Sequence, residues 1–376
     1  MTIAFFIVKF NQEEHKTVQR FFTKRTLIVL GGLIFGVLGA LMVNWGNPPN
    51  MGICVACFIR DTTGALGLHQ ASVVQYIRPE IIGLLLGAFI TAFAFREFRS
   101  RGGASPLLRF FLGALVMIGA LVFLGCPIRM MLRLAGGDLN GISALAGVIA
   151  GVLVGIFFLK RGFNLGRATR THPVVGWTIP VLTVVLLIIA ILKPGFIFAS
   201  ETGPGAMFAP LGVALAVGLV VGFLAQRTRM CFAGAWRDVF LVKDFYLISG
   251  VAAFFIAALV TNYIAGNFGA EGIYHWGFSS QPIAHSDHLW NFLGMSLVGL
   301  AATLIGGCPL RNLILTGEGD TDAGATVLGY FAGAAFAHNF LLASSPNGTG
   351  TWGPAAVIIG LASCIAIGFL MREKVT

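Results

Sequence analysis

The chain has 376 residues, of which 57% are hydrophobic and 11% are charged, and its mean hydropathy is +0.87. This composition excludes an ordinary water-soluble globule, because lipid must solvate most of such a surface. The net charge of +10 indicates membrane topology and not nucleic-acid binding, since the basic residues lie at the ends of apolar stretches. We therefore predict an all-α polytopic membrane protein whose solvent is the lipid bilayer, with no nucleic-acid partner.

Ten apolar stretches approach the length of a transmembrane helix, which is about 17 to 25 residues. The first follows several basic residues and lacks a clean cleavage site, so we expect it to stay as a span and not to be removed as a signal. In chain order the predicted spans cover residues 26–45, 79–95, 107–124, 141–159, 174–192, 210–225, 246–265, 289–305, 323–342 and 353–371.

The distribution of basic residues predicts the orientation of these spans. If the N-terminus is cytoplasmic, most of the 25 Lys and Arg residues fall on the cytoplasmic side. The loops at 266–288 and 343–352, which would then be external, contain no Lys or Arg. We therefore predict a multi-pass protein of a bacterial or archaeal plasma (inner) membrane with both termini in the cytoplasm.

The sequence contains an internal repeat, carried by two cysteine motifs. In each half a cysteine is followed six residues later by an Arg-Asp dipeptide: Cys54 by Arg60 and Asp61, and Cys231 by Arg237 and Asp238. Each half also has a Gly-Cys-Pro tripeptide with an arginine three residues and an aspartate twelve residues after its cysteine: Cys126 with Arg129 and Asp138, and Cys308 with Arg311 and Asp320. Matching spacings at four positions are poorly explained by chance.

An odd number of predicted spans separates the two copies, so the second copy is expected to be inverted in the membrane. Inverted repeats with broken helices that meet near the midplane are typical of secondary transporters. The domain organisation that follows is a basic cytoplasmic N-terminal segment at 1–25, membrane repeat 1 at 26–159, a linker with one connecting transmembrane helix at 160–209, membrane repeat 2 at 210–342, and a C-terminal transmembrane helix with a short cytoplasmic tail at 343–376.

Each Gly-Cys-Pro motif predicts a re-entrant half-helix. The proline fits the first helical position, where its missing N–H costs nothing, so Cys126 and Cys308 are expected at the N-caps. The free amides of a first turn, the helix dipole and an arginine one turn later would together bind an anion beside a sulfur atom. Non-helical backbone at membrane depth is tolerated only inside protein or along a water-filled cavity, so these segments should line a path.

Several alternatives stand beside this interpretation. Buried cysteines often serve only for packing. Cys54 and Cys57 form a C-x-x-C motif, which suggests a redox couple, a disulfide or half of a metal site. The repeat has Gly234 at the second position and offers no other close cysteine pair, so no metal site is predicted. The Arg-Asp dipeptides are interpreted equally well as structural ion pairs and as ligand-binding groups.

The residues also carry a family resemblance. The GCP-x-R segments around Cys126 and Cys308, the segment RMCFAGAWRD at 229–238 and the two-repeat layout resemble the YeeE/YedE sulfur-transport family. The stretches MGICVACFIRDTTGALGLH and YIRPEIIGLLLGAF are more similar to its YedE-type branch, which is assigned to selenium transport. The resemblance covers about residues 20 to 370. It implies an hourglass of re-entrant segments in which the four repeat-matched cysteines line a central route, while Cys57 belongs to the selenium-branch pattern alone.

We therefore predict a transporter, and not an enzyme, that imports a small selenium-containing or related sulfur-containing anion and needs no cofactor. The alternatives are a thiosulfate or sulfite permease and a membrane thiol oxidoreductase, which would gain nothing from inverted copies. A cytosolic sulfur or selenium carrier protein is a further candidate partner. The predicted substrate pathway consists of Cys54, Cys57, Cys126, Cys231, Cys308, Arg60, Arg129, Arg237, Arg311, Asp61 and Asp238.

Overall fold

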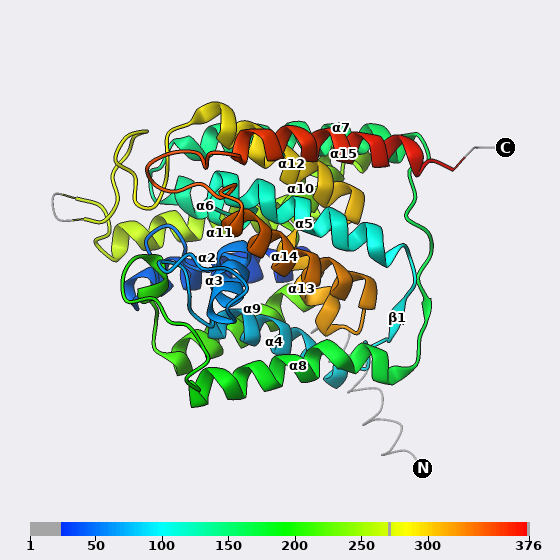
Figure 1. Cartoon of the computed structure of the whole chain (residues 1–376), viewed down its shortest axis with the longest axis horizontal. Coiled ribbons are helices and arrows are strands. Elements are labelled where there is room, and N and C mark those ends of the chain that lie inside the picture. The colour runs from blue at the N-terminus through cyan, green and yellow to red at the C-terminus, as the bar shows by residue number, and fades with distance from the viewer. Residues whose placement is uncertain (1–23, 270–271, 374–376) are drawn as a thin grey trace, which may run out of the picture.

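The computed structural model describes residues 24–269 and 272–373, so nearly all of the predicted N-terminal segment 1–25 lies outside the described residues. Figure 1 shows long helices that run side by side along one direction. Ten of the described helices have 16 residues or more: α2 (Lys24–Asn44), α4 (Pro79–Ala94), α5 (Pro106–Phe123), α7 (Asn140–Lys160), α8 (Pro173–Leu192), α9 (Leu211–Thr228), α11 (Tyr246–Ile264), α12 (His288–Ile305), α14 (Thr321–Asn339) and α15 (Gly353–Leu370).

Four shorter helices interrupt this pattern, two in each half of the chain. They are α3 (Val55–Ala65), α6 (Pro127–Ala135), α10 (Phe232–Val242) and α13 (Pro309–Gly317). Every residue of α3 is buried, as are nearly all residues of α6 and α13. The remaining described elements are the 3₁₀ turn η1 (Pro204–Ala206) and the two-residue strands β1 (Arg101–Gly102) and β2 (Thr169–Arg170), which pair antiparallel.

Each of the ten predicted spans coincides with one long helix to within three residues at either end. Eight helical segments have the length and hydropathy to cross a membrane when α5 with α6, α9 with α10 and α12 with α13 are counted as continuous runs. The other two are α4, which has 16 residues, and α14, whose ends carry Asp322 and His338. The predicted all-α polytopic membrane protein is confirmed.

The two halves of the chain do not pack as separate bodies, because helices of one half pack mainly against helices of the other half. In order along each half, α2 corresponds to α9, α4 to α11, α5 to α12 and α7 to α14. The most extensive contacts join α2 to α11 and α9 to α4, and likewise α5 to α14 and α12 to α7. Because every such pair is matched by its counterpart, the packing has the pattern of an internal two-fold relationship.

Glycines bring the backbones of these pairs close together, as small residues do in membrane helix packing. On α7, Gly147 and Gly151 lie directly against the carbonyl oxygens of Phe292 and Ser296 on α12, where a Cβ atom would overlap the backbone. The backbones of α7 and α12 are therefore in direct contact at these two glycines.

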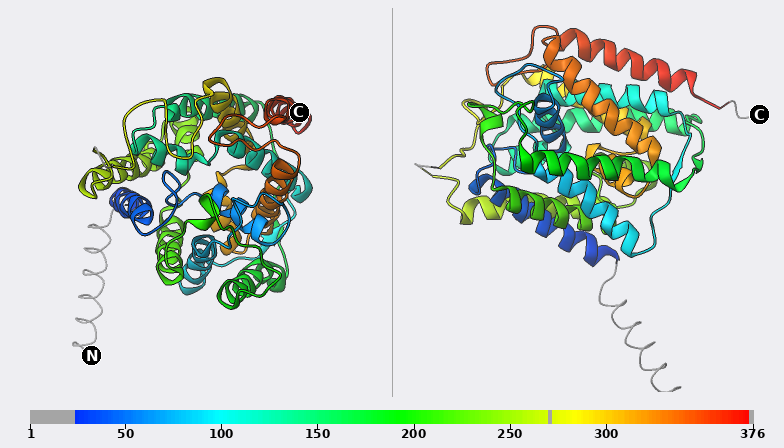
Figure 2. Two further views of the ribbon diagram at one scale, coloured as in Figure 1. Left: turned by 60° about the vertical axis from the view of Figure 1, so that its left-hand side comes forward. Right: turned by 60° about the horizontal axis from the view of Figure 1, so that its bottom comes forward.

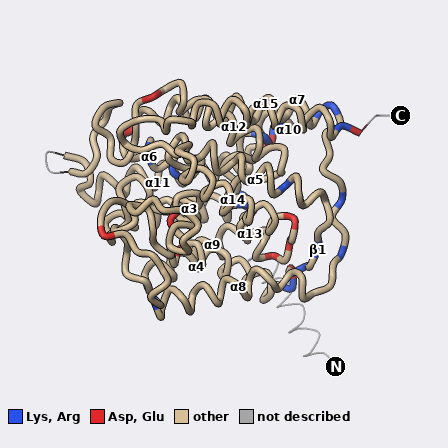
Figure 3. The backbone as a smooth tube through the Cα atoms, viewed as in Figure 1, with Lys and Arg blue, Asp and Glu red and all other residues tan. Residues whose placement is uncertain are grey.

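The described ends of the chain lie toward the same end of the bundle. The start of α2 and the end of α15 both point to the side where β1 lies, and α8 and α15 run along the periphery (Figures 1 and 2). Figure 3 shows that Lys and Arg residues are gathered at this end of the bundle, around the ends of α5, α7 and α15. The opposite end, with the long loop between α11 and α12, carries few basic residues.

Candidate functional site

All four short helices begin at a cysteine. Cys126 and Cys308 are the N-cap residues of α6 and α13, each followed by proline at the first helical position, as the sequence predicts. Cys54 and Cys231 cap α3 and α10 in the same way, and their side chains accept hydrogen bonds from the first turn. Four sulfur atoms therefore sit at the positive ends of four half-helices.

The first half of the chain brings three thiols together, and we call Cys54, Cys57 and Cys126 the first cysteine cluster. The sulfur atoms of Cys54 and Cys126 are 3.7 Å apart. The Cys54 sulfur also accepts a hydrogen bond from the Cys57 amide at 3.3 Å. All three side chains are fully buried and free of disulfide bonds. The structure thus places Cys57, which has no counterpart in the second half, inside the same cluster as the two repeat-matched cysteines.

Arg129 is the cation of this cluster. Its Nη1 donates to the sulfur of Cys57 at 3.3 Å, and its Nη2 donates to the carbonyl oxygen of Ile283 at 2.8 Å. Its Nε has no hydrogen-bond partner, and no carboxylate of the described residues forms an ion pair with it. The side chain is completely buried. A buried guanidinium without a carboxylate partner is costly inside a membrane protein, and buried charged residues of this kind commonly mark substrate or ion pathways.

Arg60 and Asp61 pair with each other, as proposed in the structural alternative. Asp61 Oδ1 accepts from Arg60 Nε at 2.8 Å, and Asp61 Oδ2 accepts from Arg78 Nε at 2.8 Å. Arg78 continues to the carbonyl oxygens of Pro204 and Met207. Sequence reasoning missed Arg78; its position immediately before the proline that starts α4 was the available signal. The buried aspartate therefore neutralises one of two arginines and braces the start of α4 against α3.

Arg133 is a second buried arginine that sequence reasoning missed. It forms an ion pair with Asp138 and donates to the carbonyl oxygen of Phe123 at 2.9 Å. Asp138 also accepts from the side chain of Asn140 at 2.7 Å. Arg133 and Asp138 neutralise each other and hold the loop between α6 and α7, whereas the neighbouring Arg129 has no carboxylate partner among the described residues.

The second half of the chain brings Cys231 and Cys308 together, and we call them the second cysteine cluster. The Cys231 sulfur accepts hydrogen bonds from the amides of Gly234 at 3.2 Å and Cys308 at 3.3 Å. Arg237 pairs with Asp238, as expected from the dipeptide, but this pair is partly exposed. It borders an open cavity of about 350 Å³ that is also lined by Arg109.

Arg311 differs from its repeat equivalent Arg129. It lies 3.3 Å from the carboxylate of Glu318, which follows Cys308 by ten residues. The residue ten positions after Cys126 is Gly136. One arginine of the matched pair therefore has an acidic partner and the other has none. The two cysteine clusters therefore differ in the charge environment of their matched arginines.

The short helices of the two halves contact each other across the molecule. α6 packs against α10, and α3 packs against α13. Behind the second cluster, Asn312 donates to the hydroxyl of Tyr330 at 3.1 Å and to the carbonyl oxygen of Gly307 at 2.8 Å. The short helices that carry the two clusters are therefore in contact with each other.

A loop from the second half covers the first cluster, and we call residues 272–287 the roof loop. The Asn50 side chain donates to the carbonyl oxygen of Pro282 at 3.1 Å, next to the contact between Ile283 and Arg129. The ring of His285 lies 2.8 Å from the carbonyl oxygen of Val122. Ile283 has a φ of +48°, which is strained for a β-branched residue. The roof loop therefore closes one end of the site.

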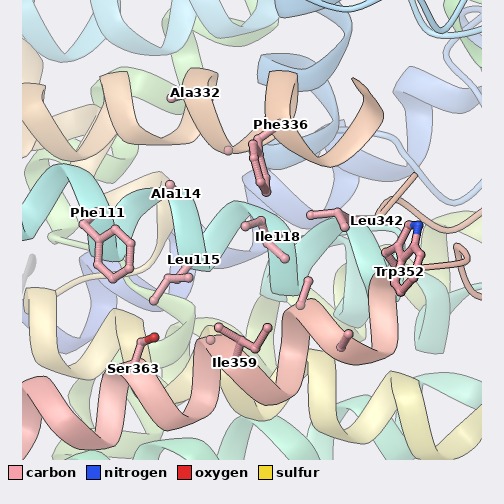
Figure 4. Close-up of a pocket in the computed structure, with 14 residues that line it drawn as sticks. Phe111, Ala114, Leu115, Ile118, Ala332, Phe336, Leu342, Trp352, Ile359 and Ser363 are labelled. Carbon is pink, nitrogen blue, oxygen red and sulfur yellow. The ribbon is translucent and has the colours of Figure 1, made fainter. Parts of the chain in front are cut away.

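An apolar cavity lies away from the cysteines. It has a volume of about 550 Å³ and lies between α5, α14 and α15, lined by apolar side chains such as Phe111, Phe336 and Trp352 (Figure 4). It holds no charged group that would bind an anion. None of the cysteines of the two clusters is among its lining residues.

Comparison with known proteins agrees with this geometry. The chain matches the model of the sulphur transport family over residues 4–154 and 227–372. A curated relative, the thiosulfate transporter TsuA of Spirochaeta thermophila, is 33% identical over 120 residues, which make up 32% of this chain and 34% of the relative. The chain thus spans about a third of the length of that relative. Because the family match covers well over half of the residues, this protein belongs to the sulphur transport family of polytopic membrane proteins.

Proposed function

We propose that this protein imports thiosulfate across the membrane. The observation that carries the proposal is the buried guanidinium of Arg129, which has no acidic partner and lies against a thiol of the first cysteine cluster. Thiosulfate has both features that this site would recognise. Its oxyanion end would pair with the arginine, and its terminal sulfur would accept weak hydrogen bonds from the thiols.

The asymmetry between the two clusters gives them different roles in the proposed route. The first cluster has the unneutralised Arg129, whereas at the second cluster Glu318 neutralises Arg311. An anion is therefore held more tightly at the first cluster and released more readily at the second. The thiols exchange hydrogen bonds with the anion along this route, and no covalent step is required.

The inverted-repeat and re-entrant architecture belongs to this proposal. The reciprocal packing of α2 with α11 and of α9 with α4 supports two copies related by a two-fold axis in the membrane plane. The basic residues at the end of the bundle that carries β1 support a cytoplasmic location for that end and for both termini (Figure 3). The roof loop would then face the outside, and the second cluster would open toward the cytoplasm.

The family description and the thiosulfate-transporting relative favour sulfur over selenium as the substrate element. The stretch around Cys57 that resembles the selenium branch stays a prediction. Selenium and sulfur oxyanions share charge and shape, so a competition measurement must separate them. The structure gives no reason to prefer selenium, because Cys57 is explained by its contact with Arg129.

Uptake into proteoliposomes tests the proposal. Purified protein is reconstituted, and accumulation of labelled thiosulfate, selenite and sulfate is measured in parallel against empty vesicles. We expect thiosulfate to accumulate and to be displaced by excess unlabelled thiosulfate. Selective accumulation of selenite would transfer the function to selenium import, and accumulation of none of the three would contradict an oxyanion transporter.

A membrane thiol oxidoreductase is the second candidate, favoured by the distance of 3.7 Å between the Cys54 and Cys126 sulfur atoms. Two thiols this close need little movement to form a disulfide. Quinone-dependent oxidation of these thiols during turnover, without movement of thiosulfate, would establish that alternative.

A further inference from the structure

We propose that Glu80 is a proton-binding site through which anion uptake is coupled to proton uptake. The inference rests on the proposed function, since it describes how the first cysteine cluster comes to bind a dianion. Glu80 lies in the first turn of α4 and is completely buried, and no sequence motif marked it. Ionisable residues buried within membrane segments commonly serve as proton carriers in transporters.

The carboxyl group of Glu80 has fewer hydrogen-bond and ion-pair partners than a permanently ionised buried side chain needs. Its Oε1 accepts a hydrogen bond from the side chain of Asn47 at 2.7 Å. Its Oε2 is buried and has no hydrogen-bond partner among the described residues. No ion pair with an arginine or lysine is formed by this carboxyl group in the described part of the chain. A buried carboxylate that lacks such partners binds a proton readily.

Opposing influences act on the same group. Burial favours its protonated form, whereas the amides of the α4 first turn and the nearby arginine at the N-cap favour the ionised form. The charged and titratable residues around it are Arg78 at the N-cap, Tyr76 in the preceding loop, Asp61 and Arg60 of α3, and Lys193, which lines a small cavity together with Tyr76. The helix α9, which packs along α4, has its charged residue Arg227 at the far end.

The balance of these charges explains how proton and anion binding assist each other. Arg60 and Arg78 together carry two positive charges, and Asp61 carries one negative charge. When Glu80 is ionised, these four residues are neutral as a set; when Glu80 is protonated, they carry one net positive charge. A dianion that arrives at the neighbouring first cluster is attracted more strongly in the second case. By reciprocity, the bound anion must raise the proton affinity of Glu80.

A structural connection leads from Glu80 to the cysteines. The Asn47 side chain that donates to Glu80 also donates to the carbonyl oxygen of Gly52 at 2.8 Å, two residues before Cys54. The Asn47 Oδ1 atom accepts from the amide of Ala209 at 2.9 Å. Protonation of Glu80 weakens it as an acceptor and therefore loosens the segment that positions the N-cap of α3. The step moves one proton onto a carboxylate oxygen and involves no electron transfer.

The experiment compares wild type with Glu80→Gln in proteoliposomes. Labelled thiosulfate uptake is measured at external pH values from about 6 to about 8, a range that brackets perturbed carboxyl groups, with the internal pH fixed. An internal pH dye reports proton entry. We expect wild-type uptake to rise several-fold toward acid pH with accompanying proton entry. We expect Glu80→Gln to lose the proton signal and most of the pH dependence, keeping only the part that comes from opening of the roof loop. Glu97→Gln serves as the matched control, because Glu97 is a partly exposed acid beyond the other end of α4.

A second measurement keeps the test decisive if Glu80→Gln does not fold. Calorimetric titration of wild type with thiosulfate in buffers of different ionisation enthalpy counts the protons taken up on binding. The proposal requires net proton uptake at pH values near neutrality. Binding without proton uptake, or equal pH dependence in wild type and Glu80→Gln, would overturn it while leaving thiosulfate transport intact. Failure of the proposed function would instead be seen as the absence of wild-type thiosulfate uptake at every pH.

Discussion

The guanidinium of Arg129 lies 3.3 Å from the sulfur of Cys57 and is the one completely buried arginine side chain of the described residues that has no acidic partner. Arg78 and Arg133, which are equally buried, pair with Asp61 and Asp138. Arg129 is thus a buried cation without an acidic partner, and it lies between the first cysteine cluster and the roof loop.

Replacing Arg129 with Gln should weaken thiosulfate binding about tenfold to a hundredfold, because a hydrogen bond to a charged group contributes roughly 1.5 to 3 kcal/mol. Arg311→Gln should have a smaller effect, since Glu318 already neutralises that arginine. Concentration-dependent uptake in proteoliposomes measures both. Equal losses in the two variants would contradict the asymmetry between the clusters.

Cys57→Ser should retain substantial uptake, because a serine hydroxyl can still accept the hydrogen bond from Arg129. Cys126→Ala and Cys308→Ala should lose most of it, since each removes a repeat-matched thiol from the route. The same uptake assay, normalised for protein amount and orientation, compares the three. If Cys57→Ser is as inactive as Cys126→Ala and the wild type oxidises thiols with a quinone, the oxidoreductase replaces the transporter.

Asp61→Asn should destabilise the fold by about 3 to 5 kcal/mol, because it leaves Arg60 and Arg78 buried without a counter-charge. Asp238→Asn removes the equivalent residue of the second half, whose ion pair is partly exposed, and should cost about 0 to 1 kcal/mol. Thermal unfolding in detergent measures the difference. Similar transition temperatures for both variants would show that Asp61 is not a structural centre.

The roof loop should control access to Cys57. Asn50→Ala removes the contact to Pro282, so the loop opens more often and a membrane-impermeant maleimide should label Cys57 faster. Ile283→Gly keeps the left-handed conformation but removes its strain, which costs a β-branched residue about 1 to 2 kcal/mol, so the closed loop is favoured and labelling should slow. Mass spectrometry of the Cys57 peptide gives the rates, with Ser279→Gly as the control for added flexibility. Identical rates in all variants would mean that the anion enters elsewhere.

Acid pH should loosen the roof loop through His285. Burial lowers the pKa of His285, so the open loop binds a proton more readily than the closed loop does. The closed state is therefore fully favoured above about pH 6.5, the ordinary pKa of histidine, and loses stability as the pH falls below that value. Hydrogen exchange of residues 278–286, corrected for the intrinsic pH dependence, should report this opening. His285→Gln should remove the effect and the exposed His288→Gln should keep it; a pH-independent wild type would exclude His285 as the cause.

Local chemistry made much of this protein predictable from its sequence. Hydropathy over about 20 residues determines whether a segment can satisfy its backbone inside lipid, and each predicted span is a helix. Proline after Cys126 and Cys308 determines where α6 and α13 begin, because the residue before a first-turn proline becomes the N-cap. The paired cysteine motifs also indicated the family, since their spacing lies within single segments.

Only the tertiary structure decided which charges remain free and what encloses them. Arg129 and Arg311 occupy equivalent positions in the sequence, yet Glu318 reaches one and no acidic side chain of the described residues reaches the other. Arg78 pairs with Asp61, which lies 17 residues earlier in the chain. The carbonyl oxygen of Ile283 accepts from Arg129 although Ile283 lies 154 residues further along the chain. These contacts depend on how rigid helices are packed across the whole bundle, and neither periodicity nor motif spacing contains that information. The sequence therefore determined the spans and the positions of the cysteines along the chain, and packing decided that Arg129 is buried without a carboxylate partner among the described residues.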